Sequence, residues 1–299
     1  MVDPTIIDTV VAEHWSAALP VLEDYIRIPA KSPAFDADWE ANGHIEAAVQ
    51  LIKGWCDERA TAGATVEVQR LPGRTPVIVV EVPATGTNDA GDTDDTVLLY
   101  GHLDKQPEME GWHDGLGPWT PVVRDDRLYG RGGGDDGYAA FAVMSAIDAV
   151  IKAGGAHRRC LAIIEASEES GSPDLPAHLD ALRDRLGQVS LVLCLDSGAP
   201  NYDALWTTTS LRGLLSVSLR VDVLERGMHS GIAGGAAPSS MRVLRLLLDR
   251  IEDAGTGALL PSGCLLYTSD AADESSRGGR SGGGGGGNRG GGGGGGGGG

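Results

Sequence analysis

The sequence has no long apolar run and carries little positive charge. No stretch approaches the ~18–20 apolar residues needed to span a bilayer, so we expect no membrane segment. Lys and Arg total 24 against 42 Asp and Glu, and the resulting net charge of −18 disfavours binding to nucleic acid or to anionic membranes. The start, Met1-Val2-Asp3-Pro4, lacks a basic region followed by an apolar core, so no signal peptide is expected.

Cysteine is scarce, and its four copies at positions 56, 160, 194 and 264 show no close spacing. Cys160 and Cys194 fall in apolar runs that predict buried strands, where a reduced thiol behaves as a small hydrophobe. The expected location is therefore cytoplasmic. With 41% apolar residues over 299 positions, the chain is long enough for one core and part of another.

Three apolar runs each end in side chains that bind metals. The run 97–101 leads to His102 and Asp104, the run 160–164 to Glu168 and Glu169, and the run 191–195 to Asp196. Such runs are typical of strands buried on both faces of a helix-covered sheet, in which ligand groups gather beyond the carboxyl ends of the strands. One run alone would be an ordinary strand end. Three runs with imidazole and carboxylates, and no Cys among these groups, indicate a Zn²⁺-type or Mn²⁺-type site.

A glycine-rich loop supplies a fourth acidic element. Residues 128–137 read Leu-Tyr-Gly-Arg-Gly-Gly-Gly-Asp-Asp-Gly, and the glycines allow close approach to a ligand or a positive φ. A helical pattern follows over 138–151. An Asp at such a junction is commonly an N-cap, and the Gly-Lys-Ser/Thr pattern of a phosphate-binding loop is absent. The loop gains meaning only together with the three strand ends.

Taken in order, these elements resemble the co-catalytic two-metal peptidases and deacylases. That family includes carnosinase-type dipeptidases, carboxypeptidase G, acetylornithine deacetylase and succinyl-diaminopimelate desuccinylase. The similarity extends over about residues 5–253 and is nearest to the carnosinase type. Its motifs are Tyr100-Gly101-His102-Leu103-Asp104, Gly111-Trp112, Leu128-Tyr129-Gly130-Arg131-Gly132 before Asp135-Asp136, Glu168-Glu169-Ser170-Gly171-Ser172, and Asp196.

The resemblance implies a fold and a set of metal ligands. The expected fold is α/β, with a mixed, mostly parallel sheet covered by helices, of the di-zinc exopeptidase type. The first part of an α+β lid or dimerisation domain is expected to follow. Two divalent ions are implied, Zn²⁺ first, with Mn²⁺ or Co²⁺ as alternatives. Asp135 would bridge the ions. His102 and Asp196 would complete one site, and Glu169 would bind the other ion.

The resemblance also implies roles for side chains that bind no metal. Glu168 would be the general base, taking a proton from a metal-bridging water and delivering it to the leaving amine. Asp104 would accept a hydrogen bond from the second imidazole nitrogen of His102 and fix its tautomer. A cis peptide bond is expected after Asp135. The adjacent carboxylates of Glu168 and Glu169 themselves favour bound cations, although such a pair in another context would be a solvated loop.

Two features depart from the family pattern. Gly137-Tyr138 stands where the family has Lys-Gly after its paired acids. The second ion should also take a His from the last stretch of the catalytic domain, and none of the remaining histidines stands in that motif. His178 is expected in a surface helix. The late His and the residues that grip the substrate carboxylate are therefore missing from the pattern.

His229 stands in Gly227-Met228-His229-Ser230-Gly231, which matches the lid-domain His-Ser-Gly motif of the family. In carnosinase-type relatives this His reaches the active site of the other subunit and contacts the substrate at the developing oxyanion. The alternative is a loop His without a partner. An alternation over 215–223 predicts a strand just before it, and 241–251 predicts an amphipathic helix after it.

The end of the chain has a different composition. From 278 to 299, eighteen of twenty-two residues are Gly, and such a segment has no apolar surface to offset its chain entropy. We expect a catalytic domain over 1–210 that lacks its C-terminal part, the first part of a lid over 211–260, and a Gly-rich tail over 261–299 that is foreign to the fold. A genuine Gly-rich linker is the alternative.

The hypothesis from the sequence is a metallopeptidase that hydrolyses dipeptides or small peptides. One alternative is an N-acyl amino acid deacylase of the same family, and another is an inactive, truncated fragment. The expected partners are a small peptide or N-acyl amino acid and, for the parent protein, a second copy joined through the lid. Neither nucleic acid nor a membrane is expected.

Overall fold

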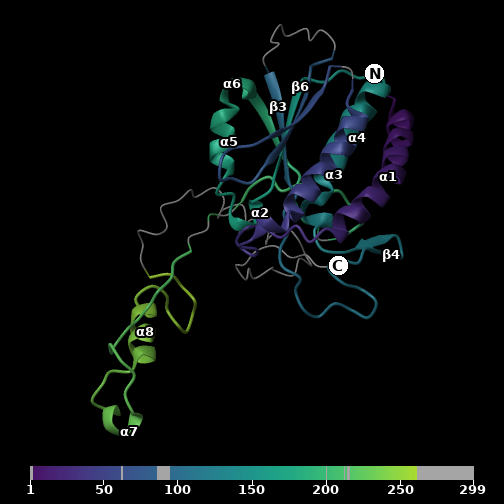
Figure 1. Cartoon of the computed structure of the whole chain (residues 1–299). Helices are drawn as coiled ribbons and strands as arrows, with labels where there is room; N and C mark the ends of the chain where they lie inside the picture. The colour runs from purple at the N-terminus through teal and green to yellow at the C-terminus, as the bar shows by residue number, and fades with distance from the viewer. Residues whose placement is uncertain are drawn as a thin grey trace. The chain divides into compact units, whose positions relative to one another are not determined.

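A five-stranded sheet organises the N-terminal part of the chain in the computed structural model (Figure 1). The structure describes residues 3–61, 63–85, 95–199, 201–211, 213 and 216–260. These divide into two compact units, Met1–Trp206 and the chain from Thr207 onward. Residues 86–94 and the Gly-rich tail expected over 261–299 lie outside the described residues. No described helix is both long and apolar enough to cross a membrane.

The strand order in the sheet is β1-β2-β6-β3-β7. β3 is parallel to both β6 and β7, whereas β2 is antiparallel to β1 and to β6. Four strands therefore run in one direction and β2 opposes them, which confirms the expected mixed, mostly parallel sheet. The strands are Thr65–Gln69 (β1), Val77–Val82 (β2), Asp95–His102 (β3), Arg159–Glu165 (β6) and Gln188–Cys194 (β7).

Helices cover both faces of this sheet (Figure 1). α1 (Pro4–Arg27), α3 (His44–Arg59) and α4 (Ala139–Lys152) lie on one face, and α5 (Leu175–Ala181) and α6 (Arg183–Leu186) on the other. Strand β2 shows the resulting two-sided burial. Its residues Ile78, Val80 and Val82 belong to the core beneath α1, α3 and α4, while Val77 and Val79 belong to the second core with Leu161, Ile163 and Leu182.

Short elements connect these layers. α2 (Trp39–Asn42) precedes α3, and a hairpin of β4 (Val122–Arg124) and β5 (Arg127–Tyr129) follows β3. The end of the Gly-rich loop, Gly133–Gly137, is a tight turn directly before α4, closed by a 2.8 Å hydrogen bond from the Gly137 backbone N–H to the Gly132 carbonyl. A 3₁₀ turn, Glu168–Ser170, follows β6.

Local sequence explains the ends of α1. Asp3 accepts a 2.9 Å hydrogen bond from the Thr5 backbone N–H, and Pro4 occupies the first turn, where its missing N–H costs nothing. The helix ends at Arg27 because Ile28 precedes Pro29 and takes an extended conformation, with φ −84° and ψ 116°. The last turn of α1 is thereby placed beside the end of β3, where the Tyr25 hydroxyl bonds the Leu103 carbonyl.

The prediction of burial is wrong for β7. All seven of its residues are exposed, including Leu191, Val192 and Cys194. The reason is its position at the edge of the sheet, where the described helices cover neither of the two faces from which its side chains project. An apolar sequence favours a covered strand, but whether it is covered depends on elements elsewhere.

His178 does not lie on a surface, contrary to expectation. It is fully buried in α5, where its ring nitrogens lie 2.9 Å from Gln69 Oε1 and 2.9 Å from the carbonyl oxygen of Thr75. Both polar atoms are thus satisfied by chain segments about a hundred residues away. The sequence of this short helix gave no sign of this, because the partners come from the distant β1–β2 region.

The second unit contains two described helices, α7 (Ser230–Ala233) and α8 (Ser240–Leu248). Ser239 caps α8 by accepting a 3.3 Å hydrogen bond from the Arg242 backbone N–H. The strand expected over 215–223 does not form in its described part, 216–223. A strand needs a partner edge for its backbone groups, and within the described residues of this unit no second strand supplies one.

Candidate metal centre

The candidate site lies where three parallel strands end together. His102 is the last residue of β3 and is in register with Glu165, the last residue of β6. The Glu168–Ser170 turn follows β6 closely, and Asp196 follows β7 by two residues. The carboxyl ends of neighbouring parallel strands share one edge of the sheet, so these side chains meet there.

One imidazole nitrogen is the centre of the cluster. His102 is fully buried, and its Nε2 lies 3.1 Å from Asp135 Oδ1 and 3.8 Å from both Glu168 Oε2 and Asp196 Oδ2. Two triads have ligand atoms that all lie within 4.8 Å of one another, His102–Asp135–Asp196 and His102–Glu168–Glu169. The structure therefore brings together every residue for which the sequence predicted a metal-binding role.

The state of Glu169 shows that these residues fit a cation. Its Oε1 is buried without a hydrogen-bond partner among the described residues, while Oε2 accepts a hydrogen bond from Gln106 Nε2. Burial, together with the negative charge of Asp135, raises the pKa of Glu169 to about 7. An unsatisfied carboxylate oxygen beside other acids is a place for positive charge, and oxygen with imidazole nitrogen suits Zn²⁺ or Mn²⁺.

His102 responds to the same excess of negative charge. Burial alone lowers its pKa, but the carboxylates of Asp104 and Asp135 outweigh burial and raise the pKa to about 12. The raised pKa favours the protonated imidazole, whose positive charge partly offsets the acids. A divalent ion on Nε2 would take the place of that proton.

Asp104 holds the Glu168–Ser170 turn, called the acidic turn below, in position. Its buried carboxylate accepts backbone hydrogen bonds from Glu168 (3.1 Å) and Glu169 (3.0 Å). The Nδ1 of His102 lies 3.0 Å from the Asp104 carbonyl oxygen and 3.5 Å from its carboxylate. The atom at hydrogen-bond distance from the imidazole is thus the backbone oxygen, and the carboxylate serves mainly the turn that carries Glu168 and Glu169.

Two glycines of the loop are required by close packing. A Cβ at Gly137 would lie 2.1 Å from the Tyr25 ring, and one at Gly132, where φ is +82°, would lie 2.7 Å from the Lys105 side chain. The peptide bond between Asp135 and Asp136 is cis, which confirms the expectation from the resemblance. Asp136 is buried, and its Oδ2 accepts a 3.2 Å hydrogen bond from the His102 backbone N–H.

The end of α1 contacts the segment around His102 and, through the Tyr25 ring, the Gly-rich loop. The Tyr25 hydroxyl donates to the Leu103 carbonyl at 2.8 Å, between His102 and Asp104. The buried Lys105 ammonium donates to the carbonyls of Tyr25 (2.7 Å) and Ile28 (2.8 Å) and lies 3.8 Å from the Tyr25 ring centroid. The sequence analysis missed Tyr25 and Lys105, and the only signal was a lysine directly after the His-x-Asp motif.

A second support lies beneath the acidic turn. Glu165 is buried and accepts hydrogen bonds from Tyr100 (2.6 Å), Ser172 (2.8 Å) and Ser167 (3.2 Å). Burial raises the pKa of Glu165 despite these donors. These bonds connect Tyr100 of β3 to Ser167 and Ser172, which flank the turn. Glu165 therefore helps Asp104 to fix the position of Glu168 and Glu169.

His229 belongs to the second unit, where it is exposed and its Nδ1 accepts a 3.1 Å hydrogen bond from the Gly231 backbone N–H. Its role at the substrate stays a prediction. The other histidines take no part in the cluster, since neither triad includes a described histidine besides His102. His14, for example, is 2.7 Å from Asp148 between α1 and α4.

Comparisons with known proteins agree with this geometry. The model of peptidase family M20/M25/M40 matches residues 98–248, a segment that contains every candidate metal ligand. The chain belongs to this family. Family members depend on metal, and the described residues include groups able to bind one.

Relatives in this family are named as dipeptidases. The chain is 32% identical over 158 residues to a cysteinylglycine-S-conjugate dipeptidase of Corynebacterium striatum, covering 53% of this chain and 35% of that protein. It is 30% identical over 198 residues to human Beta-Ala-His dipeptidase, covering 62% and 36%. The chain thus spans about a third of the length of these relatives.

The solved structure of a dipeptidase from Saccharomyces cerevisiae, Dug1p, shares the fold. The TM-score is 0.58 at 22% identity, and the match covers 91% of this chain and 57% of the other. At this identity the similarity shows the fold alone. It agrees with the mixed sheet and its helical layers.

Proposed function

We propose that this chain carries the metal-binding part of a hydrolase that cleaves dipeptides or other small peptides. The observation that carries the proposal is the group of three carboxylates within 3.1–3.8 Å of His102 Nε2. Family membership supports the same reaction, because relatives are named as dipeptidases.

Two divalent ions are proposed as cofactors, Zn²⁺ first. His102 and Asp196 would hold one ion and Glu169 the other, with Asp135 shared between them. When bound, such ions polarise the scissile carbonyl and lower the pKa of water. The buried, unpartnered Oε1 of Glu169 supports its place among the ligands.

Glu168 is proposed as the general base. Burial raises its pKa, and the charges of Asp196 and Asp104 add to this effect, so Glu168 accepts a proton more readily than an exposed Glu. It takes a proton from the attacking water and gives it to the leaving nitrogen as the C–N bond breaks, which releases a carboxylate and an amine. Asp104 aids this transfer by fixing the backbone of residue 168.

The activity is proposed for a protein of the relatives' length. In this chain the family's late His ligand is not among the residues of the cluster, so we expect weak metal binding on the Glu169 side and little turnover. We further propose that 1–210 is the catalytic domain and that 211–260 begins a lid through which the parent forms a homodimer. His229 would contact the substrate, and the protein would be cytoplasmic.

The test compares Glu168→Gln with the unaltered sequence in a full-length version of the protein. Hydrolysis of a set of dipeptides is measured with Zn²⁺ or Mn²⁺, and bound metal is counted by mass spectrometry. We expect turnover to fall by about 10²–10⁴-fold while metal stays bound, because Glu168 moves protons and donates no ligand.

The matched control is Glu58→Gln, a change at an exposed residue of α3, which should leave turnover unaltered. If Glu168→Gln loses metal, Glu168 is a metal ligand and Glu169 becomes the candidate general base. Cleavage of N-acyl amino acids without dipeptide cleavage would favour the deacylase. Robust turnover by residues 1–299 alone would contradict the expected need for the late His.

A further inference from the structure

A buried arginine beside the candidate metal centre has a side-chain donor without an acceptor among the described residues. Arg131 is 5% exposed, and its Nε–H finds no acceptor among the described residues. Its guanidinium forms no ion pair with any carboxylate in the described part of the chain. Asp135 is near enough for Arg131 to help lower its pKa, after the larger effect of His102, but the Asp135 carboxylate contacts His102 instead.

Such an arginine is unusual on energetic grounds. Buried charges are almost always paired, because removing an ion from water costs several kcal/mol that only a counter-ion or hydrogen bonds offset. Arginine also stays charged at any pH that the protein tolerates, so it cannot escape the cost by losing a proton. The Arg131 guanidinium therefore calls for an anionic or strongly accepting partner from outside the described residues.

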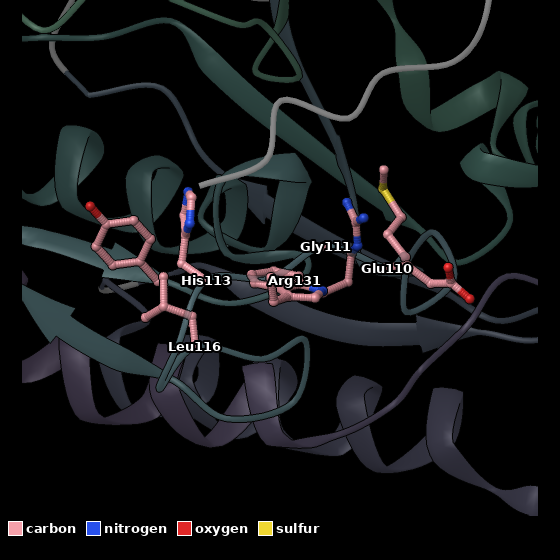
Figure 2. A pocket seen from close by; sticks show the side chains of 8 residues that line it. Glu110, Gly111, His113, Leu116 and Arg131 are labelled. Atoms are coloured by element: carbon pink, nitrogen blue, oxygen red, sulfur yellow. The ribbon is translucent and has the colours of Figure 1, made fainter.

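Arg131 lines a pocket that can admit that partner. The pocket has a volume of about 340 Å³, and its other walls include Trp112, Leu116 and Tyr129. Figure 2 shows Arg131 between His113 at one end of the pocket and Glu110 at the other, with the Glu110 carboxylate directed away from the guanidinium. The volume lies at the lower end of the range for small-molecule sites and suits a group of the size of one amino-acid residue.

We propose that this pocket is a binding subsite for a carboxylate of a small peptide, with the Arg131 guanidinium as its anchor. A carboxylate matches the planar fork of an arginine and accepts two parallel N–H bonds. The aromatic and aliphatic walls pack against the carbon atoms that carry it. Identifying the ligand as a peptide rests on the proposed function, whereas binding of the carboxylate does not.

The position of the subsite relates it to catalysis. Arg131 and Asp135 belong to the same loop, four residues apart, and the Arg131 backbone N–H is fixed by a 2.8 Å bond to the Pro118 carbonyl. A peptide anchored at Arg131 would thus be held by the segment that also carries a predicted metal ligand. The carboxylate has two sources in a peptide, the C-terminus and an acidic side chain.

Calorimetric titration of the full chain in EDTA separates these sources. Ala-Glu carries both carboxylates and Ala-Gln only the terminal one. Ala-Glu amide carries only the side-chain carboxylate, and Ala-Gln amide carries neither. We expect Ala-Gln or Ala-Glu amide to bind, and Ala-Gln amide to bind at least about tenfold more weakly. Equal binding of all four probes overturns the proposal, as does preference for inorganic phosphate over every dipeptide.

Variants assign the effect to Arg131. Arg131→Gln should raise the Kd of the dipeptide that binds best by about ten- to a hundredfold. The Kd of Arg131→Lys should lie between those of the unaltered chain and Arg131→Gln. Arg124→Gln removes an exposed arginine from the neighbouring strand β4 and should leave the Kd unaltered. An unchanged Kd in Arg131→Gln overturns the proposal.

A measurement on the unaltered chain covers the case in which Arg131→Gln does not fold. Phenylglyoxal labels arginine, and the peptide containing Arg131 is followed by mass spectrometry. The preferred dipeptide should slow this labelling and Ala-Gln amide should not, and equal rates overturn the proposal. Because these experiments contain no metal, carboxylate binding at Arg131 can be observed even if the protein hydrolyses no peptide. If the protein is active and Arg131→Gln changes neither binding nor activity, only the subsite proposal is contradicted.

Discussion

The Tyr25 hydroxyl donates a 2.8 Å hydrogen bond to the carbonyl oxygen of Leu103, the residue between His102 and Asp104. Tyr25 is fully buried in the last turn of α1, so this bond joins the first helix directly to the segment that carries the imidazole. The same ring packs against Gly137 at the end of the Gly-rich loop. One side chain thus sets the distance between the two segments that carry the candidate ligands His102 and Asp135.

Replacing Tyr25 with Phe should weaken this link. The Leu103 carbonyl would stay buried without a donor, which costs about 1–3 kcal/mol in the free energy of unfolding. Metal affinity should fall as well, because His102 is held less firmly. Urea unfolding and metal titration measure the two effects. Tyr202→Phe, at a residue that is 76% exposed, is the control and should change neither quantity.

Asp104→Asn tests the support of the acidic turn. Asn replaces one of the two carboxylate oxygens with an NH₂ donor, so the backbone N–H of either Glu168 or Glu169 loses its acceptor. We expect metal affinity to fall by about 10–100-fold. Asp126→Asn, in the exposed turn between β4 and β5, should leave the affinity unchanged. Equal affinities for Asp104→Asn and the unaltered chain would show that the turn holds its shape without this carboxylate.

Two glycines of one loop should respond differently to alanine. At Gly137 a Cβ would lie 2.1 Å from the Tyr25 ring and 2.6 Å from the Gly132 carbonyl oxygen, so the loop or the helix must move. We expect a loss of about 1–3 kcal/mol or more of stability, with weakened metal binding. Gly134→Ala places its Cβ in open space and should stay within about 0.5 kcal/mol of the unaltered protein. Calorimetric unfolding of both variants decides the matter.

Stability in acid should depend on Asp174. Its carboxylate accepts hydrogen bonds from the Thr75 backbone N–H (2.9 Å), the Thr75 hydroxyl (3.0 Å) and Arg74 (2.8 Å). Burial opposes these donors, but the donors prevail and hold the pKa of Asp174 below its ordinary value of 3.8. The contribution to stability is therefore complete above that value and is lost as the pH falls through the lowered pKa.

The measurement is urea unfolding from pH 7 down to pH 3. Asp174→Asn should be less stable at pH 7, by about 1–3 kcal/mol, and should lose less stability on acidification than the unaltered chain. Asp180→Asn, an exposed residue of α5, is the control. Parallel pH profiles for Asp174→Asn and the unaltered chain would contradict the assignment.

Much of the fold and of the candidate site could be predicted from local patterns. The apolar runs over 97–101 and 160–164 fall in β3 and β6, and α4 begins directly after the Gly-rich loop, because these signals depend on neighbours in sequence. The ligand candidates also follow from sequence, since the carboxyl ends of parallel strands always share an edge. The motifs of the family then identified which of those polar residues meet.

Other features depend on partners far along the chain. His178 is buried because Gln69 and Thr75 satisfy it, and β7 is exposed although its residues are apolar. Neither outcome has a local signal. The same is true of the carboxylate of Asp104, whose partners are backbone groups more than sixty residues away.

The sequence by itself determined the elements, their order and the chemical character of the site, because periodicity and residue type act over short distances. Only the tertiary structure decided which atoms satisfy one another. It placed the end of α1 against the His102 segment, gave the Asp104 carboxylate to the turn that carries Glu168 and Glu169, and buried the Nε of Arg131 without an acceptor among the described residues. The physical reason is that burial and hydrogen bonding are properties of the whole packed chain, and each polar group takes the partner that packing brings to it.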